Sequence, residues 1–529
     1  MQGPIQDGSS PLRVFGIPEL TDLICKQIPK SDNARLLRVC RLFFHQVCPF
    51  VWEHTNSPLD LVSMIPSGGI VKHEEKGRPP RAVSDYLHLF RWVSINNRFV
   101  RLIQVMRLPT TDPLDLSHFN LYAPNVKHLE IPAVLDVDEY QNWEAFLDRV
   151  QSLSLLPNLE RLEVTFSGHW ATEHVRVDII NLVITFLSSN LRHLHIFSGF
   201  KIDARRRNWI HAGVARKLLQ DASQKCHRLE SMSLFPGEIQ LGVQGNILFS
   251  LALHDIASPL SSLTGLCTLL ITPVVIKPTA LAALGQLPSL ETLSVVSPRR
   301  NQESYPDILE IPDDAFPSLK TLELIGLTWE ACTMLCRLKP LVQNLRGASF
   351  ENYDYSPTDL GDSHTRLISI LAGHKSSITQ LSVVGYNYSW NITSELIEAI
   401  QRLQLVGLTW CNPGLYTPRI EDFLRTLDLG QLQELRLVTS YELRHLRLIL
   451  SCCTQLRHLN ISLIIESERE LSEMDLSPIK PQSWEPFCLW SGIFLPTPSD
   501  VLSPTAAALD KSAQKVARFG SLFSLISRS

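Results

Sequence analysis

The chain has 529 residues, of which 44% are apolar and 19% are charged, and its formal net charge is −4. This length exceeds what one compact core accommodates, so it indicates several domains or one extended repeat array. The nearly balanced charge excludes the strongly basic chains that bind nucleic acid or anionic membranes, and we expect neither as a partner.

The amino-terminal residues and the cysteines indicate an intracellular protein. Residues 1–10 are polar, are expected to be flexible, and lack the apolar core of a signal peptide. The sequence contains no run of 18 uninterrupted apolar residues, so no membrane span is expected. Its eleven cysteines follow no disulfide framework, which favours free buried thiols. We predict a cytoplasmic or nuclear protein.

Residues 14–52 have the apolar spacing of short amphipathic helices. Pro18 suits the first turn of a helix, and Pro29 ends that helix. Further apolar positions continue at helical spacing up to Pro49, which is expected to end the last helix before Trp52. A segment of about 40 residues without a disulfide or metal is near the lower limit of independent stability, so a partner that covers its apolar face would stabilise it.

Four motifs in this stretch resemble those of an F-box: IPEL at 17–20, LLRVCR at 36–41, two phenylalanines at 43–44 and PFVW at 49–52. The resemblance implies a three-helix F-box over 11–55. Such a domain docks on a Skp-type adaptor and, through it, on the cullin of an SCF ubiquitin ligase. The residues that the resemblance assigns to adaptor contacts, or to the core beneath them, are Pro18, Leu20, Leu23, Ile28, Leu36, Val39 and Trp52.

Residues 56–120 are predicted to form a linker followed by amino-terminal cap helices. Glycine, proline and mixed charges mark the linker up to about residue 80. Residues 84–106 then have apolar positions that suit one or two amphipathic helices, which would close the first unit of a repeat array. The run FNLYAPNVKHLEI at 119–131 resembles the start of the repeats in many fungal F-box proteins.

A six-residue template, L-x-x-L-x-L with any apolar residue at the L positions, recurs twelve times at intervals of about 30 residues. The units are VKHLEI at 126–131, LERLEV at 159–164, LRHLHI at 191–196, LESMSL at 229–234, LCTLLI at 266–271, LETLSV at 290–295, LKTLEL at 319–324, LRGASF at 345–350, ITQLSV at 378–383, LQLVGL at 403–408, LQELRL at 432–437 and LRHLNI at 456–461.

Each unit combines a short strand with a helix. The L-x-L end alternates as a strand does, and intervening stretches such as 394–403 and 441–453 have helical spacing. One unit cannot bury its own apolar face, but stacked units bury a continuous one. The array at 121–465 resembles a degenerate leucine-rich repeat, which implies an α/β solenoid, a horseshoe of short parallel strands and helices. The Asn or Cys that usually follows the strand is mostly missing. An ordinary α/β sheet whose strands begin with leucine remains the alternative.

The third and fifth residues of each unit point away from the core, and they form the surface on which a protein substrate is expected to bind. Their charge is mixed and modest. The substrate-binding residues that we predict from this pattern are Glu130, Glu163, His195, Glu323, Arg436 and Asn460.

No motif for catalysis or cofactor binding stands out in the sequence. It has no phosphate-binding GxxxxGK[ST] loop and no GxSxG nucleophile motif. Cys332 and Cys336 are spaced to share a helix face, but no second ligand pair lies near them in sequence, so we predict no metal. We therefore expect neither an active site nor a cofactor.

Residues 466–529 depart from the repeat and are rich in proline, serine and acidic residues, so they are expected to form a carboxy-terminal cap or a partly disordered tail. The resemblance as a whole implies the substrate-recognition subunit of an SCF-type ligase, with an unidentified protein substrate. Two alternatives remain open. One is a non-catalytic repeat scaffold whose F-box-like segment caps the array. The other is an F-box protein acting outside ubiquitination.

Overall fold

A computed structural model describes residues 17–76, 92–95, 98–133, 137–165, 176–196, 210–241, 247–250, 256–297, 310–352, 363–374, 377–385, 392–411, 421, 424–425 and 430–464. The chain divides into two compact units, Met1–Gln240 with Ser250–Ile271, and Leu241–Phe249 with Thr272–Ser529. The predicted flexible amino terminus and the predicted tail at 466–529 lie outside the described residues.

Thirteen short strands in the described part of the chain form one sheet, in the order β1-β5-β7-β8-β10-β13-β14-β15-β16-β17-β18-β19-β20. The paired strands are parallel, and helices connect many of them, as expected for a solenoid-like α/β fold. This confirms the predicted α/β class. Twelve of the thirteen strands begin within or directly beside the twelve predicted units, and the two-residue strand β1 precedes them all.

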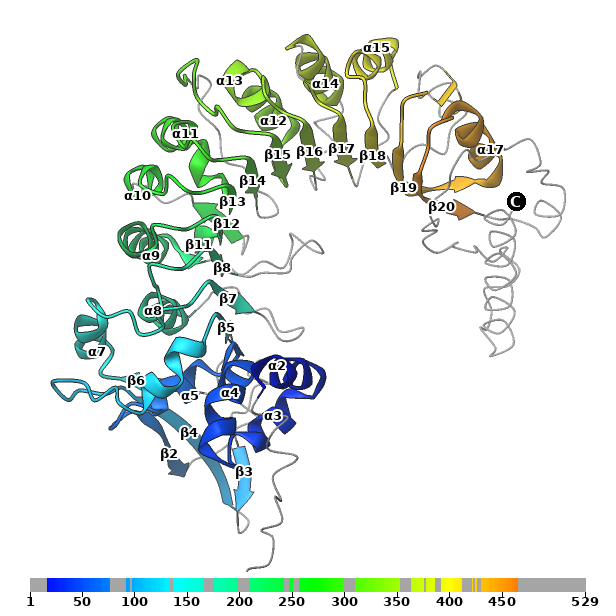
Figure 1. Ribbon diagram of the computed structural model, residues 1–529. Coiled ribbons are helices and arrows are strands. Elements are labelled where there is room, and N and C mark those ends of the chain that lie inside the picture. The colour runs from blue at the N-terminus through cyan, green and yellow to red at the C-terminus, as the bar shows by residue number, and fades with distance from the viewer. Residues whose placement is uncertain are drawn as a thin grey trace, which may run out of the picture. The chain divides into compact units, whose positions relative to one another are not determined.

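In the first unit, strands and helices alternate, and the helices lie on one side of the strands (Figure 1). The strands are β1 (His54–Thr55), β5 (His128–Pro132), β7 (Arg161–Thr165), β8 (His193–Ile196), β10 (Ser231–Leu234) and β13 (Thr268–Ile271). The helices beside them are α5 (Pro58–Ser63), α7 (Trp143–Val150), α8 (Val177–Thr185), α9 (Ala212–Lys225) and α10 (Ala257–Ser261), and short 3-10 turns η2 (Phe119–Leu121) and η3 (Ala123–Asn125) precede β5. Strand β9 (Ile210–His211) pairs in parallel with β11 (Pro236–Leu241). Strand β12 (Ile247–Ser250) belongs to the second unit except for its last residue.

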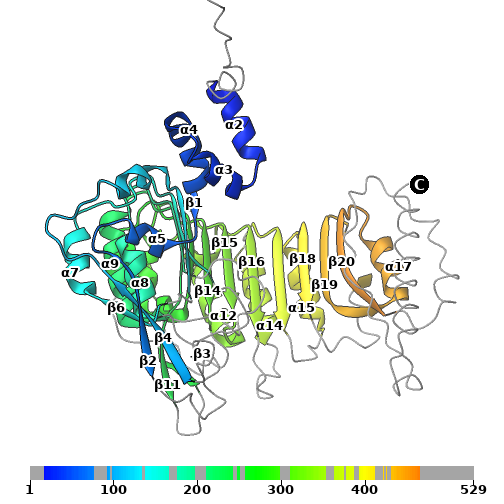
Figure 2. The same ribbon diagram turned by 90° about the horizontal axis from the view of Figure 1, so that it is seen from below.

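In the second unit, seven strands run side by side, as Figure 2 shows for β14 to β20. They are β14 (Thr292–Val296), β15 (Thr321–Ile325), β16 (Gly347–Asn352), β17 (Gln380–Gly385), β18 (Gly407–Cys411), β19 (Glu434–Glu442) and β20 (His458–Ile464). The helices and 3-10 turn of this unit are η5 (Pro273–Ile276), α11 (Pro278–Gly285), α12 (Trp329–Cys336), α13 (Lys339–Val342), α14 (Ser363–Gly373), α15 (Ser394–Arg402) and α17 (Leu443–Cys452).

The three apolar positions of each template form the core. In the first unit the central positions align in register from strand to strand as Leu129, Leu162, Leu194, Met232 and Leu269, and all five are buried. The first and last template positions are buried in the same way throughout both units. Burial of each such side chain contributes roughly 1.5–3 kcal/mol, so the repeated pattern accounts for the stacking of the strands.

A ladder of asparagine and serine side chains lines the turns that precede the strands. The amide Nδ2 of Asn158 donates to the Pro124 carbonyl in the turn of the preceding repeat at 2.8 Å. Asn190 donates in the same way to the Pro157 carbonyl at 2.8 Å. Ser318 Oγ repeats this contact with Pro288. These bonds tie each turn to the turn before it.

The register predicted for the tenth repeat of the six-residue template, at 403–408, is wrong by two residues. Strand β18 places Leu408 opposite Leu381, so the first template position is Leu405. Leu403, the predicted first position, instead ends α15 as its C-cap residue. Both leucines satisfy the template, and the length of α15 decides between them because the strand begins only after the helix has turned back.

The amino-terminal residues 17–52, called the helical segment below, form three helices: α2 (Pro18–Gln27), α3 (Lys30–Leu36) and α4 (Arg41–Trp52). Pro18 occupies the first turn of α2, as predicted. The prediction that Pro49 ends the last helix is wrong, because α4 continues through it to Trp52. Proline removes one hydrogen-bond donor, and the apolar residues of α4, packed into the core of the segment, keep the helix intact.

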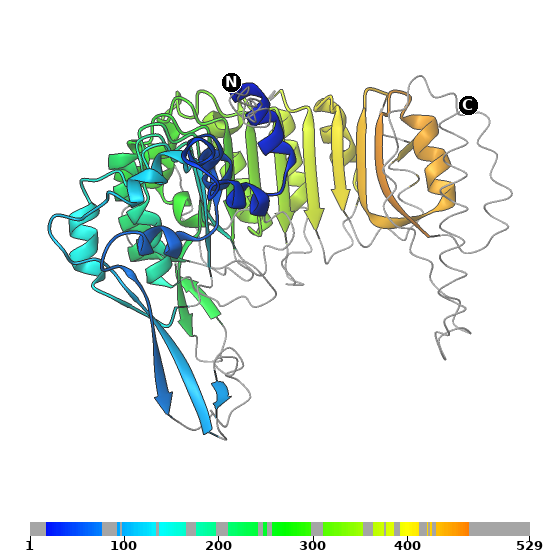
Figure 3. The same cartoon turned by 60° about the horizontal axis from the view of Figure 1, so that its bottom comes forward.

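The cap helices predicted over 84–106 are wrong where the structure describes these residues. They form strands β3 (Trp92–Ile95) and β4 (Arg98–Arg107). Strand β4 pairs antiparallel with β2 (Gly69–Lys76) and β3, and parallel with β6 (Glu139–Gln141). In Figure 3, β2 and β4 form a long twisted ribbon, drawn in blue. β-branched residues such as Val100, Ile103 and Val105 favour this outcome over a helix.

Candidate functional site

Two surfaces of the first unit stand out, and the first is on the helical segment. Every residue of this segment is described, and five large apolar side chains are exposed: Ile17 (45%), Leu20 (38%), Leu23 (58%), Val39 (63%) and Leu42 (43%). We call these five residues the apolar patch. Exposed leucine and valine side chains occur singly on most proteins, and five within 26 residues make this segment a candidate for an interaction surface.

A small core lies beneath the apolar patch. Cys25 of α2 packs with Phe43, Val47 and Val51 of α4, and partly buried side chains of α3 complete the cluster. The buried amide of Asn33 donates from Nδ2 to the Cys25 carbonyl at 2.8 Å, which ties α3 to α2. So small a core contributes little stability by itself, and it leaves the apolar patch uncovered.

The predicted adaptor-binding residues divide into two groups. Leu20, Leu23 and Val39 belong to the apolar patch, and Pro18 is also exposed at the start of α2. Leu36 and Trp52 instead pack against the core of the segment, and Ile28 is half-buried. The first group is exposed to solvent, whereas the packed residues of the second group support the helices.

The helical segment also packs against the rest of its own unit through both ends of α4 and the start of α3. The Trp52 ring lies 4.9 Å from that of Tyr122, and the Phe44 ring lies 5.8 Å from it. The Lys30 ammonium donates to the His54 carbonyl at 2.5 Å. These contacts hold α3 and α4, and they involve none of the five residues of the apolar patch.

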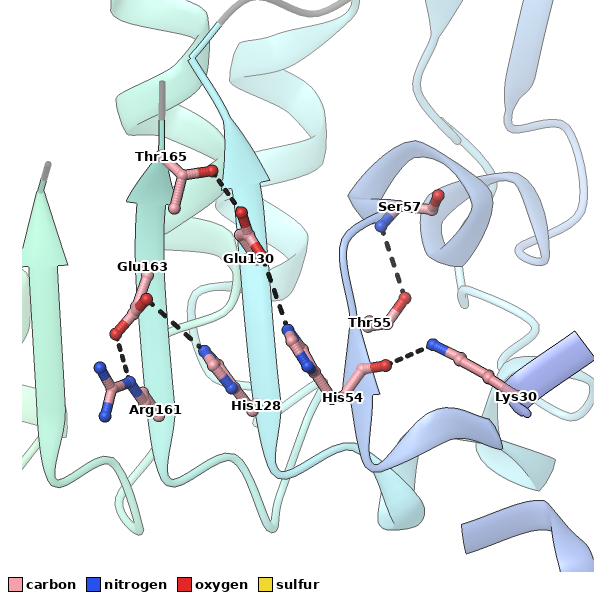
Figure 4. A network of polar contacts seen from close by, with 9 residues as sticks. All are labelled: Lys30, His54, Thr55, Ser57, His128, Glu130, Arg161, Glu163 and Thr165. Carbon is pink, nitrogen blue, oxygen red and sulfur yellow. Dashed lines mark hydrogen bonds and ion pairs between the residues drawn. The ribbon is translucent and has the colours of Figure 1, made fainter. Parts of the chain in front are cut away.

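The second surface is a network of polar side chains on the outward face of β1, β5 and β7 (Figure 4). Glu130 Oε1 accepts a hydrogen bond from Thr165 Oγ1 at 2.6 Å, and its Oε2 lies 3.5 Å from His54 Nε2. The rings of His54 and His128 stack with their centroids 4.2 Å apart. Glu130 thus has partners on both neighbouring strands.

Glu163 joins the next pair of strands in the same way. The Arg161 Nε donates to Glu163 Oε1, and His128 Nε2 lies 3.7 Å from Glu163 Oε2. At that separation the His128 contact is an ion pair only when the imidazole is protonated, and Nε2 has no hydrogen-bond partner within the described ranges. The Glu163 side chain is 8% exposed, so a residue predicted to lie on the open surface is in fact enclosed.

Strand β8 extends this surface with two imidazoles. The rings of His193 and His195 are nearly parallel, with centroids 6.2 Å apart. Burial lowers the pKa of His195 to about 4, so it is neutral at physiological pH. Burial, together with the adjacent His128, also lowers the pKa of His54. His54 and His195 therefore supply hydrogen-bonding nitrogens more than positive charge.

Of the six predicted substrate-binding residues, the structure brings Glu130, Glu163 and His195 together on β5, β7 and β8. The other three lie on strands of the second unit. Arg436 and Asn460 are in register on β19 and β20, and Glu323 is half-buried on β15.

Residues that the sequence did not single out complete both surfaces. Ile17 and Leu42 belong to the apolar patch, and their helical spacing was visible in the sequence. His54 lies on β1, which was not predicted because a two-residue strand carries no repeat template. Its in-register pairing with His128 requires knowledge of the fold.

The described residues contain no group of three or more His, Cys, Asp or Glu side chains placed to hold a metal ion. None of the helices within the described ranges is long and apolar enough to cross a membrane. No family model matches the chain, and no curated protein matches it significantly.

Proposed function

We propose that this chain is the substrate-recognition subunit of an SCF-type E3 ubiquitin ligase. In this proposal the helical segment is an F-box that binds a Skp-type adaptor, and the outward face of the strands binds a protein substrate. Catalysis belongs to other subunits of the ligase. The chain contributes proximity, because holding a substrate beside the charged E2 raises the effective concentration of its lysines.

The observation that carries the proposal is the apolar patch. It lies on the segment that carries the F-box motifs, and three of its five residues, Leu20, Leu23 and Val39, are ones that those motifs assign to the adaptor. The segment also has a core too small to stand alone. Covering each of these side chains with a partner would contribute on the order of 1–2 kcal/mol. An adaptor that covers all five would therefore stabilise both the complex and the segment.

The second candidate is a repeat scaffold in which the helical segment only caps the first strands. The pairing of β1 with β5 and the packing of Trp52 on Tyr122 favour it. These contacts account for the buried face of α4 but leave the apolar patch exposed. A segment that served only as a cap would have no need of so many exposed apolar residues, so we place this candidate second.

Co-purification of the full chain with a Skp-type adaptor tests the proposal. The double substitution Leu20→Asp with Leu23→Asp should reduce adaptor affinity at least about 100-fold, because it places two charges in an apolar interface. Both side chains are exposed, so the free chain should keep its fold. The control is Val177→Asp, which charges an equally exposed apolar residue of α8 outside the segment. Absence of adaptor binding by the unmodified chain would favour the scaffold.

Alkylation of Cys40 gives an independent readout. Cys40 is exposed between Val39 and the start of α4, whereas Cys48 is buried and its pKa is raised to about 11 by that burial. In the free chain, iodoacetamide should modify Cys40 much faster than Cys48. Bound adaptor should slow the reaction at Cys40. An unchanged Cys40 rate in a demonstrated complex would place the interface elsewhere on the chain.

Degradation is tested separately from adaptor binding. Substrates found by comparing partners of the full chain with those of the Leu20→Asp, Leu23→Asp variant should have longer half-lives when the variant replaces the normal protein. Unchanged half-lives combined with adaptor binding would indicate an F-box protein that acts outside ubiquitination.

A further inference from the structure

A row of hydrogen-bond donors crosses the outward face of the first unit. It is formed by the in-register residues His54, His128, Arg161, His193, Ser231 and Thr268 of six neighbouring strands. We call it the donor row. Each of its side chains carries an N–H or O–H group, and no carboxylate interrupts it. Six strands spaced at about 4.8 Å span about 24 Å, the length of about seven extended residues.

The carboxylates next to the donor row are already engaged. Glu130 is bound by Thr165 and lies against His54, and Glu163 is bound by Arg161 and lies against His128. These carboxylates hold the side chains of His54, His128 and Arg161 in position. Glu163 takes only the Nε of Arg161, so the two terminal nitrogens of that guanidinium are left to face a ligand. The Arg161 side chain is 46% exposed.

The groups around Arg161 suit one acidic group. On β8, His193 and His195 present ring nitrogens, and on β10 the half-buried Ser231 lies opposite His193. A guanidinium with two free terminal nitrogens binds a carboxylate or a phosphate oxygen pair in a bidentate manner. A neutral imidazole and a hydroxyl can then donate to the remaining oxygens.

We propose that the donor row binds an extended acidic segment of a protein substrate, with one carboxylate or phosphate group seated on Arg161. The inference rests on the proposed function, for which it names the substrate class. A peptide with one or two acidic groups fits this surface better than nucleic acid does. Glu130 and Glu163 lie directly beside the donor row and would repel a continuous polyanion.

The test uses the full chain and four pools of fluorescein-labelled nine-residue peptides. All pools have mixed uncharged flanking residues, and the central residue is phosphoserine, glutamate, serine or lysine. Fluorescence anisotropy should give about fivefold tighter binding of the phosphoserine pool, the glutamate pool or both than of the serine pool. The tighter of the two acidic pools identifies the source of the anion. Equal binding of all pools, or a preference for lysine, would overturn the inference.

Substitutions connect that preference to Arg161. Arg161→Gln should abolish the preference for acidic pools, and Lys217→Gln, which removes one exposed charge on α9, should leave it unchanged. Arg161→Lys keeps the charge and the pairing with Glu163 but lacks the planar guanidinium, so it should weaken the preference for acidic pools. This variant provides the test if Arg161→Gln fails to fold. An acidic preference that persists in both variants would refute the proposal.

The outcome is independent of adaptor binding. Leu23 lies on the helical segment, so Leu23→Asp should abolish adaptor binding and leave the acidic preference intact. An acidic preference without any adaptor binding would remove the ligase function and leave the donor row standing. Adaptor binding with no acidic preference would refute the role of the donor row and leave the proposed ligase function standing.

Discussion

The strands and the helical segment use similar apolar residues at regular spacing, but they differ in what covers them. In the strands, the three apolar positions of every repeat of the template are buried, as Leu129, Leu322 and Phe350 illustrate. In the helical segment, residues such as Leu23 and Val39 are largely exposed. The difference shows that periodicity identifies an apolar face but does not say whether the cover is another part of the chain or another protein.

The largest effect is expected in the strands. Leu322→Ala should lower the free energy of unfolding by about 2–5 kcal/mol, because the side chain is fully buried between β14 and β16 and the array cannot collapse around the cavity. Urea denaturation followed by circular dichroism measures it. A loss below about 1 kcal/mol would mean that the strands are loosely packed, and the contrast with the helical segment would disappear.

Within the helical segment, a buried polar residue should matter more than the exposed leucines. Asn33→Ala removes the hydrogen bond to the Cys25 carbonyl and leaves that oxygen unpaired, at a cost of about 1–3 kcal/mol. Hydrogen exchange measured on peptides from residues 17–52 should therefore become faster. The control is Asp32→Ala on the same helix, which loses only a surface pair with Arg35. Equal exchange in the two variants would contradict the role of Asn33.

Acid should weaken the strand face through His195. Its pKa is about 4 in the folded chain and about 6.5 when unfolded, so between these values the unfolded state binds the extra proton. The stability that neutral His195 contributes is complete above pH 6.5 and is lost as the pH falls toward 4, by on the order of 3 kcal/mol. Urea midpoints at pH 7 and pH 4.5 should differ less in His195→Gln than in the unmodified chain.

The turn ladder makes a smaller contribution. Asn190→Ala removes the hydrogen bond to the Pro157 carbonyl at a partly exposed site, and it should cost about 0.5–1.5 kcal/mol. Asn190→Ser introduces a shorter side chain that can still donate, and it should recover part of the loss. Ser318 makes the equivalent hydrogen bond, to the Pro288 carbonyl. Thermal unfolding of the three proteins gives the ranking, and a serine variant less stable than the alanine variant would argue against the ladder.

Much of the fold followed from the sequence because local alternation fixes a short strand. Twelve strands were anticipated from the template, and their apolar positions are buried as expected. Two errors have local causes: Leu403 and Leu405 both satisfy the template, and Val100 and Ile103 lie at spacings that also suit a helix. Strand β1 was missed because two residues are too few to show the alternation of a strand.

The candidate surfaces were less predictable because they depend on contacts between distant residues. The same spacing argument selected Leu23 and Leu36, yet the first is exposed and the second packs on the core of the segment. The pairing of His54 with Glu130 joins residues 76 positions apart, and only the register of β1 on β5 brings them together.

The smallest expected effect on stability is also the sharpest test of the comparison. Leu23→Ala removes a side chain that is 58% exposed, so it should change the free energy of unfolding of the free chain by no more than about 0.5 kcal/mol. If the proposed adaptor covers Leu23, the same substitution should weaken adaptor binding at least about tenfold, because that side chain would be buried in the complex. Isothermal titration with the adaptor and urea denaturation of the free chain give the two values. If Leu23→Ala destabilised the free chain as strongly as Leu322→Ala does, the apolar patch would already be covered by this chain and no partner would be needed to cover it.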